Sequence, residues 1–236
     1  MAESKKKFQS NLGFSWKKLF FELIVVFLGV MAAFLLNNWQ IERQEDELEQ
    51  KYLLDFSQDL NDNITMLKEA IKADSSWIAR MQPKLILIRE GTISVDSANA
   101  LTKQIVFFSR IDFKTGTYKN ITNSGKLNII RNFILRKEIV DYHISVSETE
   151  FIDDYFYKYF NDFVMPFIFS NFSILKGKMN NPEIRKTNYF ANIMAGYFSM
   201  IQQRKTAYED LLAKSYKLRD KLQITVGNHS STQGNN

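Results

Sequence analysis

One uninterrupted apolar segment constrains this chain more than any other feature. Residues 19–36, LFFELIVVFLGVMAAFLL, contain a single charged residue, Glu22, in 18 positions. At about 1.5 Å per residue, a helix of this length crosses most of a bilayer core. Thirteen of the 18 residues are Leu, Ile, Val or Phe, each of which favours insertion by roughly 0.3 to 0.6 kcal/mol, whereas one acidic residue costs about 3 kcal/mol. The segment therefore predicts a transmembrane helix, which we place at residues 14–38.

The charges on the two sides of this segment predict its orientation. Only Arg43 and Lys51 lie within about 20 residues after it, whereas five lysines precede it. Because positively charged flanks stay in the cytoplasm, residues 1–13 are expected to form a cytoplasmic tail. The bulk of the chain is then expected in the periplasm, held by the inner membrane. The five lysines are Lys5, Lys6, Lys7, Lys17 and Lys18.

Residues at the ends of the apolar segment resemble those found at a membrane interface. Trp16 and Trp39 lie 23 positions apart, about 34 Å along a helix, which is the spacing of an aromatic belt. Gly29 and Ala33 are small residues spaced to let another transmembrane helix approach closely. We expect contacts with membrane lipid here, and with a protein partner or a second copy of the chain. The predicted anchor and interface residues are Trp16, Lys17, Lys18, Glu22, Gly29, Ala33, Asn37, Asn38 and Trp39.

A cleaved signal peptide is the competing interpretation of the same segment. Residues 30–32, Val-Met-Ala, include small residues of the kind that a signal peptidase accepts. The apolar run continues past this point through Phe34, Leu35 and Leu36, whereas a cleavable signal would become polar there. An uncleaved anchor fits the pattern better.

Net charge and cysteine content exclude two classes of function. The net charge is +5, but the five lysines before the anchor account for most of it, since 26 basic and 24 acidic residues follow Leu36. No helix carries the basic stripe that nucleic-acid binding requires, so we expect no nucleic-acid partner. The chain has no cysteine, which excludes disulfides, thiol nucleophiles and thiolate metal ligands.

The remainder of the chain has helical periodicity. Apolar residues from Ile41 to Ile71 recur mainly at spacings of three and four, which predicts that the anchor continues into a long amphipathic helix ending near Ala73, with a kink at residues 74–76. Further helices are predicted after Asp96 or Ser97, Thr117, Asn132 and Thr187. Gly125 is expected to end the helix after Thr117 in the left-handed conformation. The predicted class is all-α, with residues 39–222 forming an extracytoplasmic helical bundle and residues 223–236 a disordered tail.

An aromatic segment from residue 151 to residue 172 stands out within this bundle. It contains ten Phe or Tyr residues in 22 positions, and one series repeats at every fourth residue. Such a helix is either buried on two sides or partly exposed for a partner. We take the series as the candidate partner surface, with Pro166 expected to bend or end the helix. Its members are Phe151, Tyr155, Tyr159, Phe163 and Phe167.

The usual components of a catalytic or cofactor site are scarce. Phosphate-binding glycine loops, zinc-protease motifs and calcium-loop motifs are absent from the sequence, and we expect no cofactor, no metal and no enzymatic activity. His143 is predicted to have a structural or solvent role, and His229 lies in the predicted tail. A hydrolase would require carboxylates such as Asp153, Asp154 and Asp162 to converge.

Two stretches carry a resemblance to a protein family. Residues 26–60 combine the end of the apolar segment, Asn37-Asn38-Trp39 and a charged helix with Tyr52-Leu53-Leu54; the stretch from Tyr118 to Tyr142 contains Ser124-Gly125-Lys126-Leu127. Both resemble an uncharacterised family of single-pass membrane proteins from Gram-negative bacteria. The resemblance implies an anchor followed by an extracytoplasmic helical domain, and it transfers no activity to this chain. The aromatic segment departs from the family pattern.

These patterns lead to two hypotheses for function. The first is an accessory or scaffold subunit of an envelope complex, whose helical domain binds another protein. The second is a ligand-sensing domain, in which a small molecule binds the helical bundle and shifts the membrane helix. Because the short predicted cytoplasmic tail has no output module, this role would require a partner protein to carry the signal.

Overall fold

The computed structural model describes residues 16–233, with side chains described up to residue 225. The predicted cytoplasmic tail at residues 1–13 therefore lies outside the described residues. The chain divides into two compact units, residues 1–48 and 49–236. Over the described residues the fold is all-α apart from one pair of two-residue strands, in agreement with the predicted class.

Helix α1 (Trp16–Met81) is the longest element and contributes to both units. It contains the one described segment long and apolar enough to cross a membrane, and none of that segment is buried within the structure. The predicted kink at residues 74–76 is wrong, because α1 continues unbroken to Met81. The carboxylate of Asp74 pairs with Arg204 instead of interrupting the helix. Pro83 follows within η1 (Gln82–Lys84), where its missing N–H ends the α-helical pattern.

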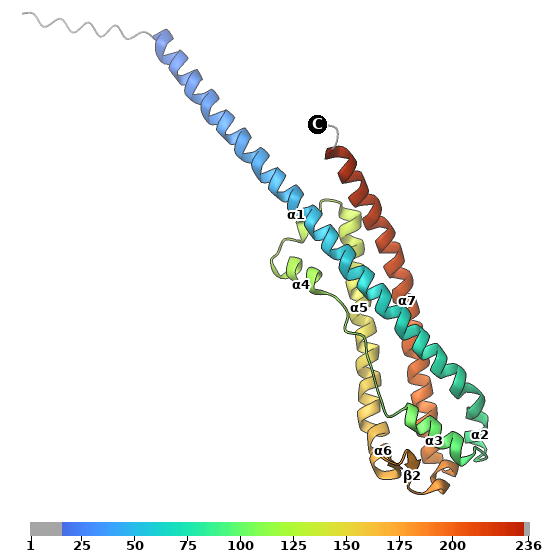
Figure 1. Cartoon of the computed structure of the whole chain (residues 1–236). Helices are drawn as coiled ribbons and strands as arrows, with labels where there is room; N and C mark the ends of the chain where they lie inside the picture. Colours follow the sequence, from blue (N-terminus) through green and yellow to red (C-terminus); the bar gives the residue numbers. More distant parts are fainter. Residues whose placement is uncertain (1–15, 234–236) are drawn as a thin grey trace, which may run out of the picture. The chain divides into compact units, whose positions relative to one another are not determined.

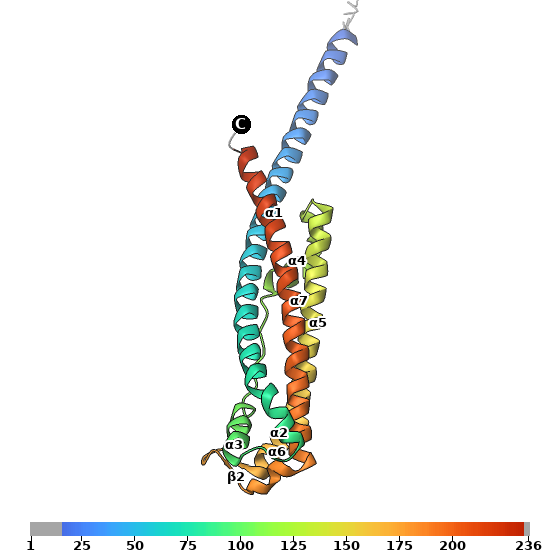
Figure 2. The same ribbon diagram turned by 90° about the vertical axis from the view of Figure 1, so that its right-hand side faces the viewer.

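The second unit is built on three long helices. From Glu49 onward α1 lies beside α5 (Phe133–Tyr159) and α7 (Asn188–Gln233), as Figure 1 and Figure 2 both show. Asn132 caps α5 as predicted, its side-chain oxygen accepting from the N–H groups of Ile134 and Leu135. Helix α7 continues to Gln233, so residues 223–233 of the predicted tail are helical, and residues 234–236 lie outside the described residues.

The aromatic segment forms three consecutive helical pieces. Helix α5 passes into the π-helix η3 (Phe160–Val164), which passes into α6 (Met165–Asn171). Pro166 lies in the first turn of α6, where its missing N–H requires no partner. The π turn widens the helix just before the proline. The helix therefore changes its winding near Pro166 and ends five residues later.

Short elements gather at one end of the bundle. Helices α2, α3 and α6 and strand β2 lie at this end in both ribbon views (Figures 1 and 2). The strand pair, which the sequence did not predict, turns through Gly177 at a φ of +61°, a conformation that favours glycine. Ser94 caps α3, in place of the predicted Asp96 or Ser97. The elements are α2 (Leu85–Arg89), α3 (Val95–Gln104), β1 (Phe172–Ser173), β2 (Lys178–Met179) and η4 (Pro182–Lys186).

A long connection between α3 and α5 is fixed by a side chain of α1. Asn63 is buried, and its amide makes two hydrogen bonds with the backbone of Lys114, at 2.7 and 3.0 Å. The connection contains α4 (Gly116–Asn123) and η2 (Leu127–Ile129). Helix α4 begins one residue before the predicted cap, Thr117, and Gly125 follows it at a φ of +68°, as its predicted left-handed position requires.

Two apolar clusters make up the core, and a polar layer separates them. On α1, one cluster ends at Leu67 and the other begins at Trp77. The same division occurs on α5 and α7. Between the two clusters each long helix has one buried charged residue: Asp74 on α1, Asp153 on α5 and Arg204 on α7. Buried charges are costly unless paired, so this layer constrains how the three helices align.

Candidate functional site

The predicted anchor residues all lie on α1, in the first of the two units. Every side chain from Trp16 to Asn37 is exposed within the described structure, and Asn38 is half-buried. Glu22 is the one charged residue in the apolar run, and a Cβ atom added at Gly29 would meet nothing within 4 Å. The guanidinium of Arg43 lies 5.7 Å from the ring centre of Trp39. Apart from Glu22, the segment thus presents an apolar surface, as contact with lipid would require.

Only some of the side chains in the predicted partner surface are exposed. Phe151 and Tyr155 on α5 are 72% and 56% exposed, and Phe163 in η3 is 53% exposed. Tyr159 is half-buried and its hydroxyl donates to the carbonyl of Ile193 at 3.1 Å. Phe167 is fully buried, so its inclusion was wrong. A repeat of four residues advances about 40° around a helix at every step, so the fifth member of the series faces the core.

A groove lies beside Phe151. Its volume is about 590 Å³, and its walls come from Tyr118 of α4 and from α5. His143 lines it, stacked on Tyr118 with ring centres 3.9 Å apart. Burial lowers the pKa of His143 to about 4, so the ring is neutral at pH 7, consistent with the structural role predicted for it. The α5 residues lining the groove are His143, Ile144, Ser147, Glu148, Phe151 and Ile152.

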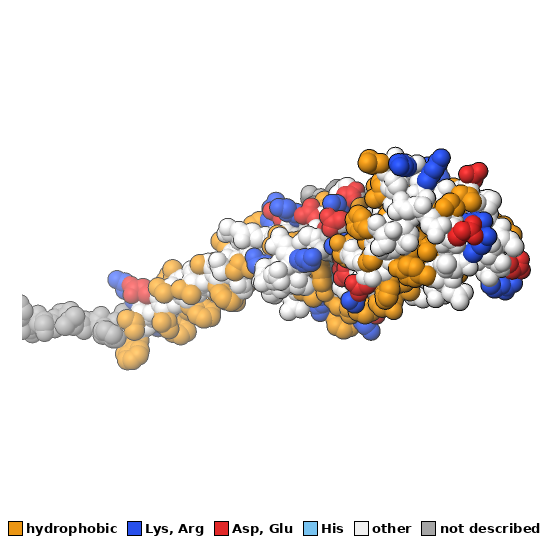
Figure 3. Space-filling model, turned by 90° about the horizontal axis from the view of Figure 1, so that it is seen from below, with side chains coloured by type: hydrophobic (Ala, Val, Ile, Leu, Met, Phe, Trp, Pro, Cys, Tyr) orange, Lys and Arg blue, Asp and Glu red, His pale blue; other side chains and the backbone are white. Residues whose placement is uncertain are grey.

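The exposed apolar side chains extend to the end of the bundle that carries the short elements. Phe163 and Phe169 are exposed there, as are Ile174 and Leu175 in the strand turn. Figure 3 views the molecule from this end and shows apolar side chains interspersed with acidic and basic ones. Aromatic residues surrounded by polar ones are typical of protein-binding surfaces.

The buried polar layer is a network of ion pairs and hydrogen bonds. Arg204 donates from Nε and Nη2 to the two carboxylate oxygens of Asp74, at 2.9 and 2.5 Å, and from Nη1 to the carbonyl of Ser109. The Tyr208 hydroxyl lies 2.8 Å from both carboxylate oxygens of Asp153 and donates to them. Burial raises the pKa of Asp153 to about 6, against the opposing effect of the Tyr208 hydrogen bond. Arg204 therefore pairs directly with Asp74, whereas Asp153 is bonded to the Tyr208 hydroxyl.

The carboxylates that a hydrolase would need do not all converge. Asp153 and Asp154 line a pocket of about 210 Å³, where Asp154 pairs with Arg110 at 2.6 Å. Asp162 is outside this pocket and pairs with Lys158 at 2.8 Å. Over the described residues, no group of three His, Cys, Asp or Glu side chains is placed to hold a metal ion.

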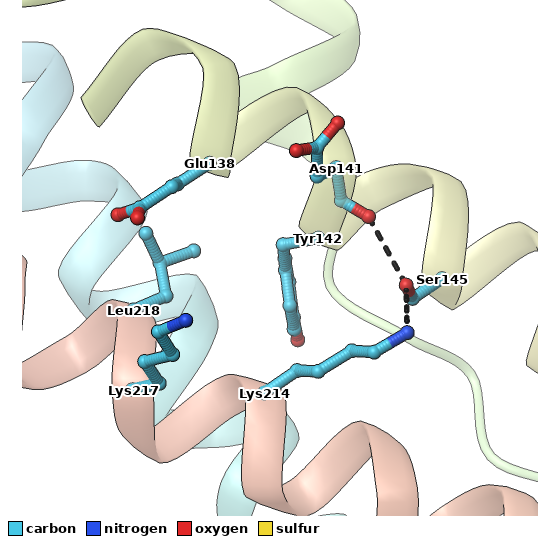
Figure 4. Close-up of a pocket in the computed structure, with 7 residues that line it drawn as sticks. All are labelled: Glu138, Asp141, Tyr142, Ser145, Lys214, Lys217 and Leu218. Carbon is cyan, nitrogen blue, oxygen red and sulfur yellow. Dashed lines mark hydrogen bonds between the residues drawn. The ribbon is translucent and has the colours of Figure 1, made fainter. Parts of the chain in front are cut away.

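A separate pocket lies between α5 and α7. Its volume is about 240 Å³, and Figure 4 shows carboxylates projecting from α5 and lysines from α7. Lys214 reaches across it and donates to the hydroxyl of Ser145 at 2.7 Å. Tyr142 lies between the two helices, where its hydroxyl accepts from Asn63 at 3.3 Å. The lining residues are Glu138, Asp141, Tyr142, Ser145, Lys214, Lys217 and Leu218.

None of the charged residues of this pocket was singled out from the sequence. The available signal was spacing: Glu138 and Asp141 are three residues apart, as are Lys214 and Lys217, so each pair shares a helix face. The spacing does not reveal that the acidic face of one helix meets the basic face of the other. That pairing follows from the packing of α5 on α7.

Comparisons with known proteins identify no relative of this chain. No family model, no curated protein and no solved structure matches it. The resemblance to a family of single-pass membrane proteins therefore stays a prediction.

Proposed function

We propose that this chain is a single-pass inner-membrane protein whose helical domain binds another protein in the periplasm. It would act as an accessory or scaffold subunit of an envelope complex. Residues 49–222 would supply the binding domain, and the apolar start of α1 would supply the anchor.

The anchor is supported by the character of the first part of α1. It is the one described helix long and apolar enough to cross a membrane, and none of its apolar window is buried within the structure. The lysines that precede it favour a cytoplasmic N-terminus. A reporter enzyme that is active only outside the cytoplasm, fused to the C-terminus, is expected to be active, whereas a reporter that is active only in the cytoplasm is expected to be inactive at the same position.

The exposed aromatic side chains of α5 carry the proposal of a protein partner. Phe151 and Tyr155 are more than half exposed although the same helix buries Phe156 completely. Large aromatic side chains contribute strongly to protein interfaces when a partner covers them. The groove beside Phe151 would accept an apolar side chain of that partner.

Photocrosslinking from native membranes tests the partner directly. A benzophenone amino acid is placed at position 151 or 155 of the full-length protein, with the exposed position 210 on α7 as the control. Adducts of one defined mass are expected from 151 and 155 and not from 210. The absence of adducts at both positions, or equal adducts at 210, would contradict the proposal. The mass distinguishes a different protein from a second copy of the chain.

Ligand sensing is the second candidate function. The pocket between α5 and α7 favours it, because charged residues of both signs and two hydroxyl-bearing residues line a concave site. In this role a bound small molecule would change how α5 packs on α7, and a partner protein would carry the signal.

A further inference from the structure

In the pocket between α5 and α7, the acidic residues lie on one helix and the basic residues on the other. Glu138 and Asp141 project from α5, whereas Lys214 and Lys217 project from α7 (Figure 4). These four charges sum to zero. A simple anion would be attracted by the two lysines but repelled by the two carboxylates. A simple cation would be attracted by the carboxylates but repelled by the lysines. A ligand with both charges would match both walls.

Several of these groups have unmet bonding capacity. One carboxylate oxygen of Glu138 binds Lys221, whereas the other, Oε2, is buried and has no hydrogen-bond donor in the described structure. Such orphaned buried acceptors are rare and require an explanation. The Lys214 ammonium donates to the neutral Ser145 hydroxyl. Among the described residues, neither Lys217 nor Asp141 takes part in an ion pair.

We propose that this pocket binds a small zwitterion of the amino-acid kind, with a carboxylate and a primary amine on the same carbon. The ligand carboxylate would lie between the ammonium groups of Lys214 and Lys217. Its amine would donate to Glu138 Oε2 and Asp141. The ring of Tyr142 and the side chain of Leu218 would contact the ligand's side chain.

The volume of the pocket limits the ligand to a small molecule. At about 240 Å³, the pocket is smaller than the roughly 300 to 1,000 Å³ that holds drug-sized ligands. A peptide or a nucleotide would exceed it. The inference rests on the sensing role proposed above and names its ligand class, but it concerns residues other than Phe151 and Tyr155.

Calorimetric titration of the full-length protein in detergent tests the inference. The probes are the twenty standard L-amino acids, followed by the N-acetyl and carboxamide derivatives of the tightest binder. At least one amino acid is expected to bind saturably, and each derivative, having lost one charge, is expected to bind at least about tenfold more weakly. No saturable binding by any amino acid up to about 10 mM, or equal binding of both derivatives, would overturn the inference.

Matched variants assign the binding to this pocket. Lys217→Gln and Asp141→Asn alter exposed side chains, so both variants are expected to fold, with an unchanged unfolding midpoint. Each is expected to weaken binding about tenfold. Lys137→Gln on α5 and Asp210→Asn on α7 make the same chemical changes at exposed positions outside the pocket and are expected to leave binding unchanged. Equal affinity in all four variants would overturn the site, and crosslinking from position 151 reports separately on the partner.

Discussion

Arg204 and Asp74, 130 positions apart in the sequence, form a buried two-point ion pair that joins α7 to α1. The guanidinium also lies 4.9 Å from the ring centre of Phe156 on α5. The pair occupies the gap between the two apolar clusters of the core. If one helix slid by a turn, about 5.4 Å, Arg204 would be buried without its carboxylate. The ion pair therefore favours one alignment of the three long helices.

Asp74→Asn is expected to destabilise the protein strongly. The substitution keeps the shape of the side chain but leaves the Arg204 charge without its partner in a buried site. Removing one member of a buried pair costs about 3 to 5 kcal/mol. The free energy of unfolding, measured by chemical denaturation of the full-length protein in detergent, should fall by that amount.

Two further variants test the physical reason for this loss. Glu209→Gln breaks the Lys205–Glu209 pair on the surface of α7 and is expected to cost less than about 1 kcal/mol. The double variant Asp74→Leu, Arg204→Met removes both charges and is expected to be more stable than Asp74→Asn. A loss for Asp74→Asn no larger than that for Glu209→Gln would contradict the assigned role.

His143 and Asp153 are expected to give opposite pH dependences of stability. The pKa of His143 is lowered from 6.5 to about 4, so only the unfolded chain binds a proton between these values, and stability falls as the pH falls. The pKa of Asp153 is raised from 3.8 to about 6, so the folded chain protonates first, and stability rises as the pH falls. The two effects oppose each other between about pH 4 and 6.

Single variants separate these two effects. Asp153→Asn removes the effect that stabilises the protein in acid, so its unfolding free energy should fall more steeply than that of the parent from pH 7 to pH 4. His143→Phe keeps an aromatic ring beside Tyr118 but removes the effect that destabilises the protein in acid. Its unfolding free energy should therefore rise, relative to that of the parent, as the pH falls from 7 to 4. Each difference is expected to reach up to about 3 kcal/mol. Identical slopes for both variants and the parent would contradict the pKa shifts.

The elements predicted well from the sequence are those that depend on local chemistry. The cap at Asn132 requires only an acceptor two or three residues before the first unpaired N–H groups. Gly125 ends its helix because the chain must adopt a positive φ there. The apolar run before Asn37 is recognised from its length and composition, without reference to any tertiary contact. In each case the deciding atoms lie within a few residues of one another.

The wrong predictions concern residues whose partners are distant in the sequence. The burial of Glu49 likewise depends on a distant partner, because its carboxylate accepts from the backbone N–H of Arg131, 82 positions away. Asp74 was expected to interrupt α1, and Arg204 pairs with it instead. The charged pocket was missed because neither helix alone reveals which face of the other it meets.

Gly196→Ala is expected to destabilise the contact between α5 and α7. A Cβ atom at this position would lie 2.2 Å from the Tyr159 hydroxyl oxygen, so the tyrosine would have to move and lose its hydrogen bond to Ile193. Overpacking of this kind costs about 1 to 3 kcal/mol, more than the helix propensity that alanine adds. Chemical denaturation should show a lower unfolding midpoint.

Gly116→Ala is the matched control for this steric prediction. A Cβ atom there would meet nothing within 4 Å, and the backbone φ is not positive, so stability should stay the same or increase by up to about 1 kcal/mol. The double variant Gly196→Ala, Tyr159→Leu should lose less unfolding free energy than the sum of the losses in the two single variants, because the leucine side chain is smaller and removes the clash. Strict additivity would show that the two residues do not collide.

Phe151→Ala and Phe167→Ala are expected to have opposite consequences although both residues belong to one four-residue repeat. Phe151 is exposed, so its removal should change the unfolding free energy by no more than about 0.5 kcal/mol while abolishing copurification of the proposed partner. Phe167 is fully buried against Tyr189 and Phe190, so its removal should cost about 3 to 5 kcal/mol. Chemical denaturation and copurification from native membranes measure the two effects separately.

Two outcomes would contradict this prediction. If Phe151→Ala destabilised the protein as much as Phe167→Ala, Phe151 would have a structural role. If the Phe151→Ala variant still copurified with the partner, the aromatic surface would not be the binding site.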